Sequence, residues 1–129
     1  RVLQVAALAA FPLTFVWLSG TSFTPLGFGV FFTAMITAAQ FNFWGSYLPR
    51  IFPTHLRGTG ESFAANVGGR IIGTTAALAT TTLATRLTAQ FGAGRALALA
   101  AATVATLACV IGLIASHFLT EPESDALPQ

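Results

Sequence analysis

Long apolar stretches separated by short polar segments divide the chain into four parts. Residues 2–19 are apolar apart from Gln4, Thr14 and the central Pro12, which predicts a kinked helix just long enough to span a bilayer. Further apolar stretches cover residues 25–48, 59–85 and 95–118. Inside lipid every backbone amide needs an internal partner, which a helix provides and an open sheet does not. The pattern therefore predicts an all-α fold with four transmembrane helices in one domain, residues 1–119.

Polar and turn-forming residues mark the ends of these helices. Thr24 and Pro25 favour the start of the second helix, because threonine caps a first turn and proline fits within it. Residues 49–58 contain two prolines and two arginines and predict a loop, and residues 86–94 predict another. Residues 120–129 are polar and acidic, which predicts a disordered tail.

The composition favours a membrane protein. Of the 129 residues, 54% are hydrophobic and only 8% are charged, where soluble domains carry about 25% charge. The formal net charge of +2 is too small to indicate a nucleic-acid partner. A secretory signal is the alternative for residues 2–19, but the chain lacks an initiator Met and three longer apolar stretches follow.

The arginines give a weak indication of orientation. Arg1, Arg50 and Arg57 would lie on one side of the membrane, with Arg86 and Arg95 on the other. Because positive residues are enriched in cytoplasmic loops, this distribution places the loop 49–58 in the cytoplasm.

Two of the predicted helices carry polar residues at helical spacing. In the second helix the polar and amphipathic positions that share a face are Thr33, Thr37, Gln40, Trp44 and Tyr47. In the third helix the residues that share a face are Ser62, Asn66, Arg70, Thr74, Thr81 and Thr85, here called the polar stripe. The first and fourth helices have only scattered polar residues, which predicts that they stand outside, toward lipid.

Arg70 is the strongest candidate for a functional residue. It lies about ten residues into its predicted helix, or about 15 Å deep, where an arginine is costly unless it meets an anion, a carbonyl or water. This predicts a substrate cavity or path, with companion residues Asn66, Gln40, Thr37 and Trp44. The alternative for such stripes is helix packing, for which Gly69 and Gly73 form a small-xxx-small pair.

The residues that enzymes and metal sites require are scarce. No Asp or Glu lies at depth in the four predicted spans, so neither a proton relay nor a paired-carboxylate site is expected here. His55 and His117 lie at helix ends far apart in sequence, and Cys109 is the only cysteine. We therefore expect no catalytic residue, no bound metal and no cofactor.

Residues 47–73, YLPRIFPTHLRGTGESFAANVGGRIIG, resemble a segment of major facilitator superfamily transporters. The similar segment joins the tenth and eleventh helices in the metabolite:proton and sugar symporter groups, with the pattern YLPE-hydrophobic-FPT-x-hydrophobic-RxTG, then SF-x-x-N and GR. The matching positions are Tyr47, Leu48, Pro49, Phe52, Pro53, Thr54, Arg57, Thr59, Gly60, Ser62, Phe63, Asn66, Gly69 and Arg70. Arg50 replaces the usual glutamate, so a loop salt bridge from that glutamate is not expected here.

The resemblance implies that the four helices are the last four of a twelve-helix transporter. Its tenth and eleventh helices would line the central cavity and its ninth and twelfth would stand outside. The loop 49–58 and the tail would be cytoplasmic, and Arg50 and Arg57 could clamp a cytoplasmic gate. Two six-helix halves rock about a central site in such transporters, so this chain would hold only part of that site.

The expected function is that of a C-terminal fragment of a secondary active transporter in the inner membrane. Arg70 suggests a small organic acid as the metabolite, and proton coupling would use carboxylates in the missing N-terminal helices. The main alternative is a structural or accessory membrane subunit without transport activity. A dimeric four-helix exporter like the small multidrug resistance proteins is disfavoured, because residues 2–19 lack the glutamate on which those proteins depend.

Overall fold

The structure, a computed structural model, describes residues 2–119, with the backbone alone at Phe43 and Trp44. Across these residues the chain is helical and contains no strand, which confirms the predicted all-α class. The elements are α1 (Val2–Pro12), η1 (Leu13–Trp17), η2 (Leu18–Gly20), α2 (Phe23–Ala39), α3 (Asn42–Ile51), α4 (Arg57–Phe63), η3 (Ala64–Gly68), α5 (Gly69–Phe91) and α6 (Ala93–Ala115). The predictions for Arg1 and for the tail 120–129 lie outside the described residues.

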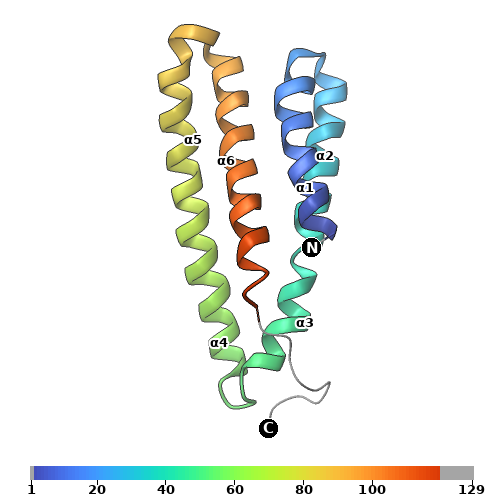
Figure 1. The fold of residues 1–129 in the computed structure, drawn as a ribbon, viewed down its shortest axis with the longest axis vertical. Coiled ribbons are helices and arrows are strands. Elements are labelled where there is room, and N and C mark those ends of the chain that lie inside the picture. Colours follow the sequence, from blue (N-terminus) through green and yellow to red (C-terminus); the bar gives the residue numbers. More distant parts are fainter. Residues whose placement is uncertain (1, 120–129) are drawn as a thin grey trace.

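The helices form a row in the order α5, α6, α1, α2 (Figure 1). Helix α5 packs along α6, α6 packs against α1 and η1, and α1 packs against α2. The α1–α2 and α5–α6 turns lie at one end of the row, and the α3–α4 turn lies at the other. Helices α1 and α6 thus occupy the middle and α2 and α5 the flanks, so within this row the first and fourth helices are not the outer ones.

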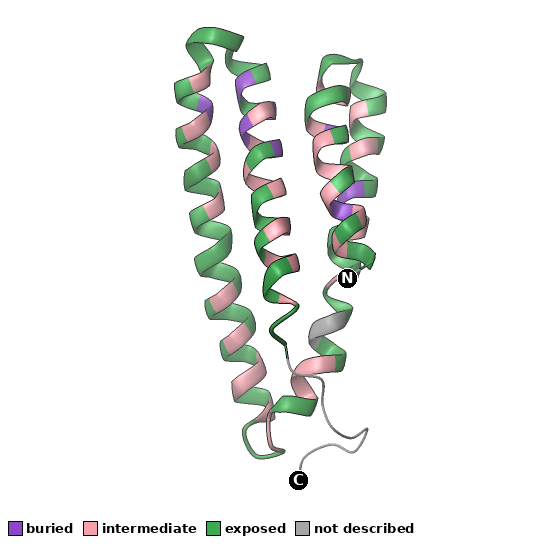
Figure 2. Ribbon diagram, viewed as in Figure 1, coloured by how far each residue is buried: buried purple, intermediate pink, exposed green. Residues whose placement is uncertain are grey.

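The hydrophobic residues buried inside this row have small side chains. All the buried hydrophobic residues among those described are alanines: Ala7, Ala84, Ala96, Ala98, Ala100 and Ala102. Most of the described residues are exposed (Figure 2). They include large apolar side chains such as Phe23, which is 89% exposed, and Phe118, which is 83% exposed. Alanine lets helix backbones approach closely, and so much exposed apolar surface needs lipid or protein around it.

Two helical segments are long and apolar enough to cross a membrane. They are Val2–Gly20, with 19 residues, and Ala93–Ala115, with 23 residues. Only 11% of the apolar window in each is buried, whereas the core helix of a soluble protein is mostly buried. Phe23–Ala39 is apolar but shorter, and α5 is not among the apolar spans. The structure therefore confirms that the described chain is all-helical and has two long apolar segments. It does not confirm four transmembrane helices.

The first predicted helix changes form where the sequence predicts a kink. Regular α-helix ends at Pro12, and the next turn, η1, is a π-helix. Proline lacks the amide hydrogen that closes a regular turn and crowds the carbonyl four residues back. A wider turn after Pro12 accommodates this loss.

The second predicted helix is interrupted, contrary to the continuous span expected over 25–48. Helix α2 ends at Ala39 and α3 begins at Asn42. The amides of Gln40 and Phe41 donate to carbonyls three residues back, at 3.1 and 3.0 Å. This is the hydrogen-bond pattern of a 3₁₀ turn, and it interrupts the α-helix. Helix α3 continues through Pro49 to Ile51, which shortens the predicted loop 49–58 to residues 52–56.

The predicted loop over 86–94 is wrong. Helix α5 continues to Phe91 and α6 begins at Ala93, so Gly92 alone forms the turn. Its φ of 77° and ψ of 157° belong to a region that is essentially restricted to glycine. Residues 86–91 contain neither proline nor glycine, so nothing in them ends the helix before that point.

Candidate functional site

A buried pair of hydroxyls joins the first two helical segments. Thr14 Oγ1 lies 2.8 Å from Thr33 Oγ1 and donates to the carbonyl of Gly29 at 3.3 Å. A Cβ on Gly29 would lie 2.5 Å from Leu18 Cδ1 and 3.2 Å from Thr14 Cγ2, so a side chain here would displace the end of Leu18 and press on Thr14. Sequence reasoning missed the contact, although Gly29 and Thr33 form a small-xxx-small pair that could have indicated it.

The candidate residues of the second predicted helix do not face α5. Thr33 is buried against η1, and exposed Thr37 donates its hydroxyl to the Thr33 carbonyl at 2.8 Å. Gln40 is half-buried at the break between α2 and α3, and the side chain of Trp44 lies outside the described residues. Because α2 packs on α1 and η1 while α5 packs on α6, the structure does not bring Thr37 or Gln40 to Arg70.

The polar stripe runs along an exposed face of α4, η3 and α5. All six of its residues are exposed. Asn66 lies in the π-helical η3, where its Nδ2 donates to the Ser62 carbonyl at 2.9 Å. Thr81 and Thr85 donate to carbonyls of their own helix, and the hydroxyl of Thr74 has no hydrogen bond within residues 2–119. Turns of π-helix occur frequently at functional sites, and this one holds a candidate residue.

Arg70 lies nearer the end of the apolar layer than expected. Helices α5 and α6 both have 23 residues and run antiparallel from Gly92, so Arg70 is level with the last turn of α6. The expected depth of about 15 Å was counted from a helix start near residue 60. However, α4 and η3 extend that helix beyond the end of α6 (Figure 1). Arg70 is exposed, and its guanidinium forms no hydrogen bond or ion pair with any described residue.

Asn66 and Arg70 therefore remain as a pair on one face, one helical turn apart. The two gate candidates flank the turn 52–56, with Arg50 exposed in α3 and Arg57 half-buried at the start of α4. The Phe52 ring packs against Gly60 in α4, where an added Cβ would lie only 2.6 Å from the ring. The residues on either side of the turn are thus held close together at the α3–α4 end of the molecule.

Gly69 and Gly73 do not serve as a packing pair among the described helices. Both are exposed, and nothing lies within 4 Å of a Cβ added at either position. The close helix approach predicted at this pair occurs instead at Gly29 in α2. The glycines leave a flat patch on α5 that another helix could approach.

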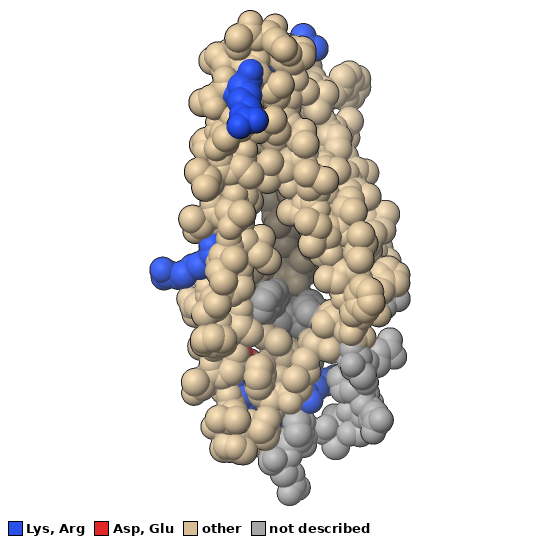
Figure 3. Space-filling model, turned by 60° about the vertical axis from the view of Figure 1, so that its left-hand side comes forward, with Lys and Arg blue, Asp and Glu red and all other residues tan. Residues whose placement is uncertain are grey.

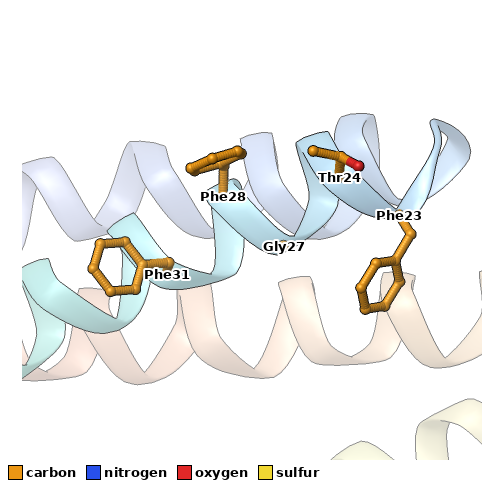
Figure 4. Close-up of a pocket in the computed structure, with 5 residues that line it drawn as sticks. All are labelled: Phe23, Thr24, Gly27, Phe28 and Phe31. Atoms are coloured by element: carbon orange, nitrogen blue, oxygen red, sulfur yellow. The ribbon is translucent and has the colours of Figure 1, made fainter.

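The structure also shows an apolar groove on the outer face of α2. It has a volume of about 450 Å³ and is lined by Phe23, Thr24, Gly27, Phe28 and Phe31 (Figure 4). Within residues 2–119 no three His, Cys, Asp or Glu side chains come together as a metal site.

Comparison of the chain with models of known protein families, with curated proteins and with solved structures found no match. The similarity of residues 47–73 to major facilitator transporters therefore stays a prediction from sequence.

Proposed function

We propose that this chain is a membrane-embedded part of a secondary active transporter for a small organic anion, with one wall of the substrate path on α5. The observation that carries the proposal is the pairing of a polar helix, α5, with an apolar helix of the same length, α6. The two lie side by side from Gly92 to their far ends (Figure 1). A bilayer that covers α6 must therefore also cover α5.

The exposed face of α5 is poorly suited to lipid. Thr74, whose hydroxyl has no hydrogen bond within residues 2–119, lies along it within the length spanned by α6, and Arg70 lies where that length ends. Thr81 and Thr85 share this face but donate to carbonyls of their own helix. Polar groups at membrane depth meet water or other protein, because lipid offers them no hydrogen bonds. This face is therefore suited to a water-filled path or to the remaining helices of a transporter.

The position of Arg70 favours an anionic substrate. Its guanidinium and the Asn66 amide lie one turn apart at the mouth of the proposed path, where they would attract a carboxylate and hydrogen-bond its oxygens. Glu61 is the only acidic residue between positions 2 and 119. Coupling to protons would therefore rely on carboxylates contributed by other helices of the transporter.

A role as an accessory subunit is the second candidate. The open patch at Gly69 and Gly73 lies on α5 and would fit a helix of a different polypeptide equally well. Such a subunit would copurify with an obligatory partner and would show no uptake of its own.

Uptake by the protein expressed from its source locus tests both candidates. We would purify it with an epitope after Gln129, reconstitute it in proteoliposomes and measure entry of radiolabelled lactate and succinate under an imposed pH gradient. Losing the charged contact in Arg70→Gln is expected to lower uptake about tenfold. Arg95→Gln, which changes an exposed arginine on α6, is the matched control and should leave uptake within about twofold.

Three results would contradict all or part of the proposal. A strong preference for neutral sugars that Arg70→Gln leaves unchanged would contradict the anionic substrate, and equal loss in the Arg70 and Arg95 variants would contradict the role of Arg70. The third is copurification with an unrelated polypeptide and no uptake, which would support the accessory subunit.

A further inference from the structure

A second groove lies on α5, beside the polar stripe. It has a volume of about 420 Å³ and is lined by Thr75, Leu78, Ala79, Thr82, Leu83 and Arg86. The sequence predicted Arg86 to lie in a loop, but the helix continues to Phe91, so the arginine becomes part of the groove. The groove is open and shallow, and it combines apolar side chains and two threonines with one cationic side chain at one end.

The groove begins within one leaflet of a bilayer and extends past its middle. At about 1.5 Å per residue, Arg86 lies about 9 Å before the turn at Gly92 and Thr75 lies about 26 Å before it. The guanidinium is thus within a side chain's length of the membrane surface, which arginine reaches by extending along the helix. The groove then runs inward for about 16 Å, which is close to the hydrocarbon thickness of one leaflet.

The charge of Arg86 has no counterpart in the described part of the chain. Glu61 is the only acid there and lies about 37 Å farther along the same helical run. Neither the Arg86 guanidinium nor the hydroxyl of Thr82, one turn below it, forms a hydrogen bond or ion pair with residues 2–119. Nearby Thr80 and Thr88 differ, because they donate to carbonyls four residues back at 2.8 and 2.7 Å. The groove thus offers a cation and a hydroxyl donor to a ligand. Charged side chains are sparse on the face of the molecule shown in Figure 3.

We propose that this groove binds an anionic phospholipid. The phosphate would accept hydrogen bonds from Arg86, an ester oxygen would accept one from Thr82, and an acyl chain would lie over Leu83, Ala79 and Leu78. A zwitterionic lipid fits less well, because no acidic side chain on α5 or α6 can receive its ammonium group. The inference rests on the membrane location in the proposed function and is independent of transport.

Lipid retention by the purified, epitope-tagged protein tests the proposal. Native mass spectrometry would count dioleoyl phosphatidylglycerol and dioleoyl phosphatidylcholine retained from equimolar mixtures. We expect phosphatidylglycerol to be favoured, and Arg86→Gln to weaken its binding about tenfold, as for the loss of one charged hydrogen bond. The matched control is again Arg95→Gln, an exposed arginine outside the groove, which should retain the lipid like the unaltered protein.

A second variant keeps the charge and blocks the groove. Ala79→Phe adds a ring to the exposed floor while Arg86 stays in place, and we expect it to lose the lipid with unchanged helicity by circular dichroism. Equal retention in the Arg86 and Arg95 variants, or equal retention of both lipids, would overturn the proposal. Competition by glycerol phosphate as strong as that by the intact lipid would do the same, because it would show a site for a soluble anion. A protein that retains the lipid and shows no uptake would remove only the transporter proposal.

Discussion

Among residues 2–119, some threonine hydroxyls bond within their own helix and others bond between helices. Those of Thr80, Thr88 and Thr103 donate to carbonyls of their own helices, which hides their polarity from the surroundings. Those of Thr14 and Thr33 lie 2.8 Å apart and join two helices. Which kind a threonine forms depends on the neighbouring helix, so the residue type alone did not distinguish a packing contact from a substrate path.

The Thr14–Thr33 pair should contribute measurably to stability. Thr33→Val removes one hydroxyl and keeps the shape of the side chain, and we expect a loss of about 0.5–1.5 kcal/mol, the range for hydrogen bonds between membrane helices. Unfolding in mixed micelles would measure it, with a double-mutant cycle to Thr14→Val giving the coupling. Thr103→Val, an exposed position with a bond inside its own helix, should cost less than about 0.5 kcal/mol. Equal losses at positions 33 and 103 would show that the interhelical bond contributes nothing.

At the scale of the elements, apolar length located helices better than their ends. The apolar stretches 2–19 and 95–118 lie within a few residues of Val2–Gly20 and of α6, Ala93–Ala115. The break between α2 and α3 at residues 40–41 contains neither proline nor glycine, so the sequence did not predict it. At Gly92 the sequence predicted too long a break between helices. A single glycine makes the turn for which nine residues were predicted.

The turn at Gly92 gives a test of how α5 and α6 are paired. Gly92→Ala forces a side chain into a backbone conformation that other residues rarely adopt, so we expect a loss of about 1–3 kcal/mol in unfolding free energy. Gly94→Ala, in the first part of α6 with open space around it, should cause no loss. Thermal unfolding of both variants in the same detergent makes the comparison. Equal stability of the two proteins would show that the turn is not strained by a side chain.

At the scale of the molecule, spacing within one helix predicted less than the contacts between helices determine. The polar stripe shares an exposed face, as its spacing predicts, and includes Asn66 and Arg70. The partner predicted for it on α2 is absent, because α5 packs along α6 while α2 packs on α1 and approaches η1 closely at Gly29. The periodicity of a sequence predicts which residues share a face of a helix, but it does not predict which other helix covers that face.

The arrangement of the turns predicts which segments lie on each side of a membrane. The α1–α2 and α5–α6 turns lie at one end of the row and the α3–α4 turn at the other (Figure 1). In a Cys109→Ser background, a membrane-impermeant maleimide should therefore label exposed Thr21→Cys and Gln90→Cys in intact cells. His55→Cys, also exposed, should react only after permeabilisation, since the arginine bias predicts that residues 49–58 lie in the cytoplasm. Labelling of all three in intact cells would show that these helices do not cross the membrane. The reverse pattern would show that they cross it with residues 49–58 outside.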